Sequence, residues 1–270
     1  MKCDLCPRKC LVDRKKGEKG ICGQTENLKV ARAALHFWEE PCISGDAGSG
    51  AVFFSGCPLH CVFCQNENIA NGTVGKEISL ERLVDIFLEL QEKRANNINL
   101  VTPGHFVPQI VKALDQARKE GLTLPVVYNT SSYETVDTIK MLEGYVDIYL
   151  PDFKYMSPVL SKKYSHAPDY AEVAKAAIAE MVRQTGKAVF VNGDEDNLIL
   201  SGTIVRHLTL PGCMADSMQI LKYLHDTYGD MIYISIMNQF TPLSNLEKYP
   251  ELNRRITDEE YETLVDYAIE

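Results

Sequence analysis

The 270-residue sequence contains no apolar run that approaches the roughly 20 residues a helix needs to cross a membrane. Its first four residues include no apolar segment of the kind that begins a secretory signal. We therefore expect a cytoplasmic protein with no membrane partner.

The sequence also lacks an excess of basic residues, because 28 Lys and Arg stand against 37 Asp and Glu, a net charge of -9. Proteins that bind nucleic acids usually present a basic face, so no nucleic-acid partner is predicted. Residues 1–24 are a local exception, with seven Lys or Arg against three Asp or Glu, a net charge of +4. We interpret this excess as a solvated basic segment, with a docking patch as the alternative.

Cysteine is almost missing from the last three quarters of the chain, since eight of the nine cysteines lie before residue 65. A disulfide scaffold would spread its cysteines more evenly, so the crowding indicates metal or redox chemistry in a cytosolic protein. Two cysteines belong to no motif. Cys42 is expected to be a small buried hydrophobic residue. Cys213 follows a Pro-Gly turn and is expected to be a spectator, with a thiol near the substrate as the alternative.

Three cysteines, Cys57, Cys61 and Cys64, follow the apolar residues 51–54 with the spacing C-x3-C-x2-C. Three thiols on one loop can converge on iron, a metal that thiolates bind well. Structural zinc and a fully protein-ligated four-iron cluster take four protein ligands, so three cysteines leave a coordination position open for a cofactor or substrate. A zinc knuckle or three unligated buried thiols is the alternative interpretation.

A second set of cysteines, Cys3, Cys6, Cys10 and Cys22, indicates a small metal-bound lobe at the N-terminus. Four thiolates suit zinc, iron or an auxiliary iron–sulfur cluster, and the spacing does not choose among them. Because the segment has few apolar side chains, metal binding would supply much of its folding energy.

From residue 51 the pattern alternates between short apolar strands and amphipathic helices, which predicts a parallel sheet. Strands are expected at residues 51–54, 98–102, 126–130, 146–151, 203–208 and 232–237. Helices are expected at residues 79–95, 106–120, 134–143, 171–185, 215–228 and 257–269, and a hairpin at 189–200. Closed eight-fold barrels use about 250 residues. The sequence therefore predicts an α/β fold, a partial (β/α)6 TIM-like barrel over residues 51–270, preceded by a cysteine-rich N-terminal lobe and connector over residues 1–50.

The expected carboxyl ends of these strands carry polar and charged residues, whereas the strands themselves are rich in Val, Ile, Leu and Tyr. Reactive groups of parallel barrels gather at this end. The strand ends are residues 57–64, 102–105, 129–132, 152–154, 206–212 and 237–239. We expect the site to lie there.

The cysteine loop, including Phe63 before its third cysteine, resembles the cluster motif of the radical S-adenosylmethionine (SAM) superfamily. Segments 7–10, 56–66, 205–212 and 234–242 together resemble an uncharacterised branch related to pyruvate formate-lyase activating enzymes. The resemblance implies that Cys57, Cys61 and Cys64 bind a [4Fe–4S] cluster whose fourth iron chelates SAM. It implies reductive cleavage of SAM to a 5′-deoxyadenosyl radical that abstracts hydrogen from a substrate.

The resemblance also implies partners. A one-electron reductant such as flavodoxin or ferredoxin would supply the electron. The substrate would be a glycyl-radical enzyme, another polypeptide or a small molecule. A non-catalytic, metal-stabilised binding or electron-transfer protein is the alternative from a different class, and the βα alternation with polar strand ends speaks against it.

The resemblance further implies cofactor-binding residues, although no side chain is assigned a catalytic role. Thr102, Gly104 and His105 stand where relatives carry a Gly-Gly-Glu-type segment beside the SAM amino group. Because no glutamate is present there, backbone carbonyls or another side chain would hold that group. The other implied contacts are Asn129, Thr130, Ser131, Asp152, Lys154, Arg206, His207 and Met237.

Among these contacts, Lys154 would meet the SAM carboxylate, and Arg206 or His207 would lie near the ribose or carboxylate. Asp152 with the 129–130 strand end would hold a monovalent cation. Each has a plainer alternative: Asp152 and Lys154 as a simple salt bridge, the histidines as structural residues, and Met237 as packing.

Overall fold

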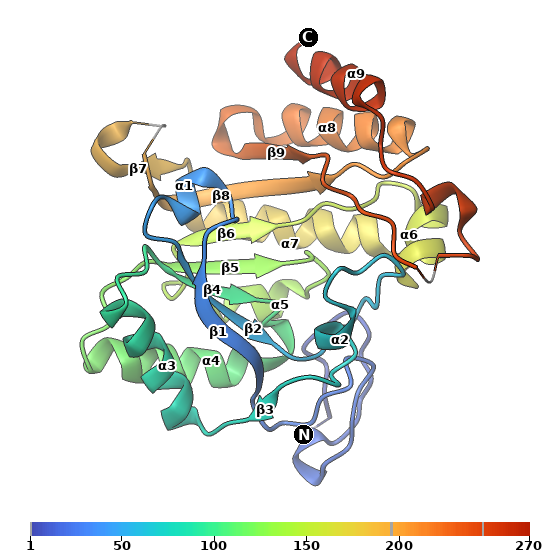
Figure 1. The fold of residues 1–270 in the computed structure, drawn as a ribbon. Helices are drawn as coiled ribbons and strands as arrows, with labels where there is room; N and C mark the ends of the chain where they lie inside the picture. The colour runs from blue at the N-terminus through green and yellow to red at the C-terminus, as the bar shows by residue number, and fades with distance from the viewer. Residues whose placement is uncertain (1, 195–196, 245) are drawn as a thin grey trace.

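The computed structural model describes residues 2–194, 197–244 and 246–270. Within them the strands form one mixed sheet in the order β3-β1-β2-β4-β5-β6-β8-β7, with β9 also paired to β8 (Figure 1). The strands are β1 (Lys29–His36), β2 (Ser49–Phe54), β3 (Lys76–Glu77), β4 (Ile98–Val101), β5 (Val126–Thr130), β6 (Ile148–Pro151), β7 (Val189–Phe190), β8 (Ile199–Leu208) and β9 (Tyr233–Met237). The helices are α1 (Pro41–Ser44), α2 (Glu67–Ala70), α3 (Leu80–Glu92), α4 (Val107–Lys119), α5 (Val136–Lys140), α6 (Pro158–Ser165), α7 (Tyr170–Thr185), α8 (Met214–Tyr228) and α9 (Asp258–Ile269).

The six strands predicted from the sequence are all present. β2, β4, β5, β6, β8 and β9 pair in that order, each parallel to the next. The sheet is curved but not closed, and β1 extends it beyond β2 as an antiparallel strand. The predicted partial barrel is therefore confirmed.

Several elements differ from the sequence prediction. The connector contains β1, which joins the main sheet, and the unpredicted helix α6 follows β6. The second arm of the predicted hairpin and the strand at 203–208 form one continuous strand, β8, against which β7 runs antiparallel. Residues 195–196 of that hairpin lie outside the described residues. Helix 134–143 is shorter than predicted: α5 ends at Lys140, and the Thr135 side chain sets its start by accepting from the Thr138 N–H.

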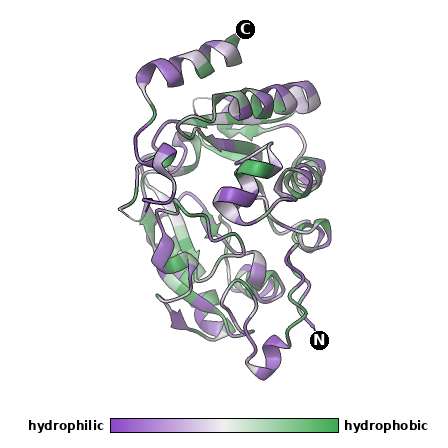
Figure 2. Cartoon of the chain, turned by 90° about the vertical axis from the view of Figure 1, so that its right-hand side faces the viewer, coloured by the Kyte–Doolittle hydropathy of each residue, from purple (hydrophilic) through white to green (hydrophobic). Residues whose placement is uncertain are grey.

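Amphipathic helices cover the outer face of the sheet, and Figure 2 shows hydrophilic and hydrophobic residues alternating along them. Leu83 and Phe87 of α3 and Ile110 and Leu114 of α4 are fully buried in the core beneath them. Burial of each such side chain stabilises the fold by about 1.5–3 kcal/mol. Among the described residues, no helix is long and apolar enough to cross a membrane.

The connector closes the amino-terminal end of the barrel. Ile43 of α1 is fully buried with Val127, Ile148 and Ile204 of three barrel strands. Asn97, just before β4, fixes α1 by donating from its side-chain amide to the Ile43 carbonyl at 2.8 Å. Because apolar side chains fill this end, space for a ligand remains at the carboxyl ends of the strands.

Candidate active site

A cavity of about 450 Å³ lies at the carboxyl ends of the strands. Its lining brings together ten of the residues predicted from the sequence: Cys57, Cys61, Cys64, Thr102, Asn129, Thr130, Ser131, Asp152, Lys154 and Arg206. Gly104, His105, His207 and Met237 were also predicted but do not line it. The cavity continues toward β1 and the connector, where its lining includes Arg32, His36, Trp38 and Glu39.

The three cysteines of the loop lie close together, since Cys61 and Cys64 raise the pKa of Cys57 and Cys61 raises that of Cys64. Burial, the larger cause, raises the pKa of Cys57 to about 12 and those of Cys61 and Cys64 in the same direction. Backbone N–H groups of Leu59 and His60 hydrogen-bond to Cys57, and the Ser165 hydroxyl donates to Cys61 Sγ at 2.9 Å. These donors favour the thiolate form that binds iron.

Across residues 2–194, 197–244 and 246–270, no three His, Cys, Asp or Glu side chains are placed to hold a single metal ion. The ligands of a four-iron cluster stand farther apart, because each cysteine binds a different iron. Cys57, Cys61 and Cys64 line one cavity and carry hydrogen-bond donors on their sulfurs, so this donor set suits a cluster better than a single ion.

The cysteines of the N-terminal lobe also lie near one another. Cys6 and Cys22 are buried, which raises the pKa of each thiol. Cys22 and Cys10 raise the pKa of Cys6 further, and Cys3 and Cys10 raise that of Cys22. The Ile21 N–H donates to Cys10 Sγ at 3.2 Å. Since the single-ion arrangement is not present among the described residues, a zinc, iron or auxiliary cluster bound by Cys3, Cys6, Cys10 and Cys22 stays a prediction.

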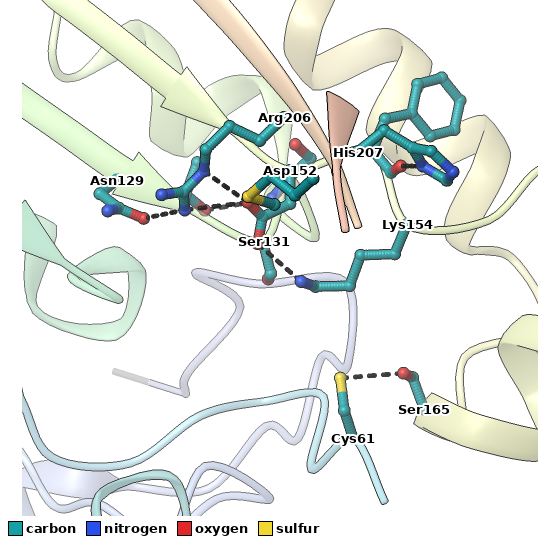
Figure 3. Close-up of polar contacts among 12 residues, drawn as sticks. Cys61, Asn129, Ser131, Asp152, Lys154, Ser165, Arg206 and His207 are labelled. Carbon is teal, nitrogen blue, oxygen red and sulfur yellow. Dashed lines mark hydrogen bonds and ion pairs between the residues drawn. The ribbon is translucent and has the colours of Figure 1, made fainter. Parts of the chain in front are cut away.

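A buried network of charges forms the wall of the cavity opposite the cysteine loop (Figure 3). Lys154 Nζ donates to Asp152 Oδ2 at 2.6 Å, and Arg206 Nε donates to Asp152 Oδ1 at 2.9 Å. Arg206 also donates to Glu39 Oε1 at 2.7 Å and to Asn129 Oδ1 at 2.8 Å. The salt bridge between Asp152 and Lys154 that was stated as an alternative is therefore present, and both residues line the cavity. A monovalent cation at Asp152 would compete with both of these donors.

Opposing effects set the protonation of this network. Burial disfavours the ionised Asp152, but Arg206 and Lys154 outweigh it and hold the pKa of Asp152 below its usual value. Burial likewise disfavours the charged Lys154, but Asp152 and Cys61 outweigh it and raise its pKa. The network stays ionised at neutral pH, and the Lys154 ammonium faces the cysteine loop.

Glu39 lines the candidate site, and the sequence reasoning missed it. Its Oε2 accepts from the side-chain amides of Asn99 on β4 at 2.9 Å and Asn129 on β5 at 3.0 Å. Because Arg206 on β8 donates to its other oxygen, Glu39 ties the connector to three barrel strands. The only signal for this residue in the sequence was a pair of adjacent acidic residues, Glu39 and Glu40, before a proline. Spacing alone could not show that this acidic pair points inward.

Both predicted histidines are buried outside the cavity lining. His207 bonds to the Phe153 carbonyl and the Ser217 hydroxyl, each at 2.8 Å, and burial lowers its pKa to about 4. His105 bonds to the Ser55 carbonyl at 2.7 Å, and burial lowers its pKa to about 4 as well. These buried positions and hydrogen-bond partners agree with a structural role for both histidines.

Two residues with a strained backbone lie beside the cavity. Thr102 and Ser132 have φ values of 55° and 63°, a left-handed backbone conformation that residues other than glycine rarely adopt. They follow β4 and β5, and the Thr102 N–H donates to the Asn129 carbonyl at 2.9 Å. Such strain persists where surrounding structure enforces it and is frequent at functional sites.

Glu134 is a buried carboxyl group directly beneath these strand ends. Its Oε1 accepts from the Thr130 hydroxyl at 2.8 Å and from Tyr128 at 3.3 Å, and a Cβ added at Gly104 would clash with both of its oxygens. Burial raises its pKa to about 7. The glycine of the 102–105 turn is thus required by the carboxyl group packed against it.

We expect this carboxyl group to make the fold pH-sensitive. Because its folded pKa of about 7 exceeds its ordinary value of 4.5, the stability that this group contributes is fully present below about pH 4.5 and is lost as pH rises through about 7. The loss amounts to a free energy on the order of 3 kcal/mol. Urea unfolding between pH 5 and 8 measures it. Glu134→Gln should flatten this decline, and an equally steep decline in that variant would contradict the assignment.

Comparison with known protein families gives one match that covers more than half of the chain: the Radical SAM superfamily, over residues 51–197. An uncharacterised protein of Methanocaldococcus jannaschii, MJ0674, is 27% identical over 275 residues, covering 98% of this chain and 74% of that protein.

Two solved structures share the fold. HydG, a maturase of the [FeFe]-hydrogenase, matches with a TM-score of 0.51 at 14% identity over 78% of this chain. Methylornithine synthase (PylB) matches with a TM-score of 0.52 at 13% identity over 79% of this chain. The present chain spans only 46% of HydG and 59% of PylB, and at these identities the likeness concerns the fold.

Proposed function

The chain belongs to the radical SAM superfamily, and we propose that it cleaves SAM at the cavity described above and abstracts hydrogen from a substrate. The family implies a [4Fe–4S] cluster and SAM as cofactors. The observation that supports the proposal is the cavity, in which Cys57, Cys61 and Cys64 face the ionised Asp152, Lys154 and Arg206.

Bound together, the cluster and SAM supply one-electron cleavage of a carbon–sulfur bond and the 5′-deoxyadenosyl radical. Cys57, Cys61 and Cys64 would hold the cluster, and the Ser165 hydroxyl would orient Cys61. The Lys154 ammonium would bind the SAM carboxylate from the opposite wall. Asp152 would hold Lys154 in place, and Arg206 would fix Asp152 and Asn129. The buried wall would also exclude water from the radical.

The SAM amino group requires an acceptor, and the 102–105 turn supplies no carboxylate. Thr102, Asn129, Thr130 and Ser131 line this part of the cavity and offer hydroxyl, amide and carbonyl oxygens. Glu134 stands just behind them, bonded to Thr130. We propose that these strand-end oxygens take the role that a glutamate has in relatives.

For the substrate we propose a glycyl-radical enzyme. The cavity reaches the side of the barrel at β1, where Arg32, His36 and Trp38 line it and Trp38 is 88% exposed. Because the sheet is not closed, a polypeptide loop can enter from this side. Mixing the reduced protein and SAM with a candidate glycyl-radical enzyme should give a glycyl-radical electron paramagnetic resonance signal. Consumption of a small molecule without that signal would reject this substrate.

Anaerobic reconstitution with iron and sulfide, followed by reduction in the presence of SAM, tests the proposed cleavage. We expect 5′-deoxyadenosine and methionine in equal amounts, because one bond cleavage produces both. Product analysis by liquid chromatography measures them. A reducible cluster that leaves SAM intact would instead support the non-catalytic electron-transfer protein.

A further inference from the structure

The cysteine loop has a second, outward side. A cavity of about 250 Å³ shares Cys61 and Cys64 with the larger one, and its lining also includes His60, Glu67 and Tyr249. Glu67 is exposed and His60 is half-exposed. The two thiols therefore stand in a thin wall between the inner cavity and the surface.

A short route connects Cys61 to the surface. Ser165, the last residue of α6, donates to Cys61 Sγ at 2.9 Å (Figure 3). The next residue, His166, is exposed. One hydrogen bond and one peptide unit thus separate this sulfur from the outside of the molecule.

The N-terminal lobe lies directly against this route. Arg8 Nε donates to the Pro58 carbonyl of the cysteine loop at 2.9 Å, and Arg8 Nη2 donates to the Ser165 carbonyl at 3.1 Å. His60 in the loop bonds to the Ile21 carbonyl of the lobe at 2.7 Å. The lobe, the loop and the end of α6 thus form one continuous surface (Figure 1), here called the loop–lobe face.

The charge of the loop–lobe face contrasts with that of the chain. Residues 1–24 have a net charge of +4, whereas the other residues hold 21 Lys or Arg against 34 Asp or Glu, a net charge of -13. The exposed cations on this face are Lys2, Lys9, Lys15, Lys16 and Lys19 of the lobe and Lys162 and Lys163 of α6. Three of these cations are paired within the chain: Lys163 with Glu251 at 2.6 Å, and Lys15 with Glu26 and Lys16 with Asp13 at 3.9 Å each. A basic face on an acidic protein attracts an acidic partner.

Apolar residues accompany these charges. Leu11 is 52% exposed and Ile21 is 49% exposed, and Ile21 is tied to the neighbouring Cys10 by its N–H. Exposed apolar side chains within a charged rim are the usual composition of a protein–protein interface. These apolar side chains would contribute nothing to the binding of a small anionic ligand.

We propose that the loop–lobe face is the docking surface for a small acidic protein that carries one electron. The inference rests on the proposed function, because such a partner is needed only if a cluster is bound by Cys57, Cys61 and Cys64. In the encounter the reduced carrier loses one electron, which passes to the cluster by way of the Cys61 side of the loop, and no bond or proton is exchanged. The carrier leaves in its oxidised form.

Stopped-flow reduction of the reconstituted protein by flavodoxin hydroquinone tests the proposal. The variant Lys9→Glu/Lys19→Glu/Lys162→Glu should be reduced at least about tenfold more slowly than the wild type at low salt. Its reduction by photoreduced deazaflavin, a small neutral reductant, should be unchanged. The matched control Lys93→Glu/Lys119→Glu/Lys187→Glu changes charge equally at the amino-terminal end of the strands and should react with flavodoxin at the wild-type rate within about twofold.

The wild-type protein gives a second, independent result. Its rate with flavodoxin should fall steeply as salt is raised from about 0.05 to 0.5 M, because salt screens steering between charged surfaces. A salt-independent rate, or equal rates for the two triple variants, would overturn the proposal. SAM cleavage is not measured in either experiment, so a protein that docks flavodoxin but leaves SAM intact would separate this inference from the proposed function.

Discussion

Cys61→Ala is expected to abolish stable cluster assembly and with it all SAM cleavage. The thiol is one of three donors on the loop, and Ser165 donates to its sulfur at 2.9 Å. Without it, two protein ligands remain, and water has to occupy the position of the missing thiolate. Iron and sulfide analysis of the reconstituted protein, together with its visible absorbance, measures the loss.

Cys42→Ala and Cys213→Ala are the matched controls. Both thiols are half-buried, and burial raises the pKa of each to about 11, yet neither lines the cavity. Their replacement should leave iron content and 5′-deoxyadenosine formation unchanged. A Cys61→Ala protein that retains a full cluster, or a Cys213→Ala protein that loses it, would refute the assignment of the loop cysteines.

Arg206→Met is expected to lower the free energy of unfolding by about 3–5 kcal/mol, because it leaves two buried carboxylates without their shared cation. Arg206 contacts Glu39 at 2.7 Å and Asp152 at 2.9 Å, and its side chain is only 13% exposed. Urea unfolding at pH 7 measures the difference. Adding Glu39→Gln to this variant should restore part of the loss by removing the carboxylate that is left without a cation, because Asp152 keeps its salt bridge to Lys154.

Arg254→Met provides the control for an exposed pair. Arg254 bonds to Glu260 at 2.7 Å, but its side chain is 46% exposed, so the expected cost is below about 1 kcal/mol. Equal losses for the two variants would contradict the importance given to the buried network.

Acid should weaken the same buried network. The pKa of Asp152 lies below its ordinary value of 3.8, so its contribution to stability is fully present above about pH 4 and is lost as pH falls through the folded pKa. The wild-type advantage over Arg206→Met should therefore shrink in strong acid.

Much of the site could be predicted from the sequence because its residues occupy strand ends. A parallel sheet brings successive carboxyl ends to one edge, so Asn129, Asp152 and Arg206 meet there although they are far apart in the chain. The same reasoning could not predict Glu39, because a connector without periodicity gives no indication of which way it points. It also placed Gly104 and His105 at the site, where tertiary packing instead puts Glu134 beneath the turn and His105 against Ser55.

The position of the N-terminal lobe could not be predicted from the sequence. Its basic charge was visible in the sequence, but its contact with the cysteine loop depends on Arg8 reaching carbonyls 50 and 157 residues away. Such a contact leaves no pattern in local spacing, so the solvated-segment interpretation and the docking interpretation could be compared only in the folded protein.

The central claim is that the three loop cysteines leave one iron of a [4Fe–4S] cluster open to SAM. Electron–nuclear double resonance of the reduced protein, with SAM labelled with ¹⁵N at its amino group, measures that bond directly. We predict a ¹⁵N hyperfine coupling that appears when labelled SAM is added and that vanishes with unlabelled SAM. A reduced cluster whose spectrum shows no coupling to the labelled nitrogen would contradict the claim.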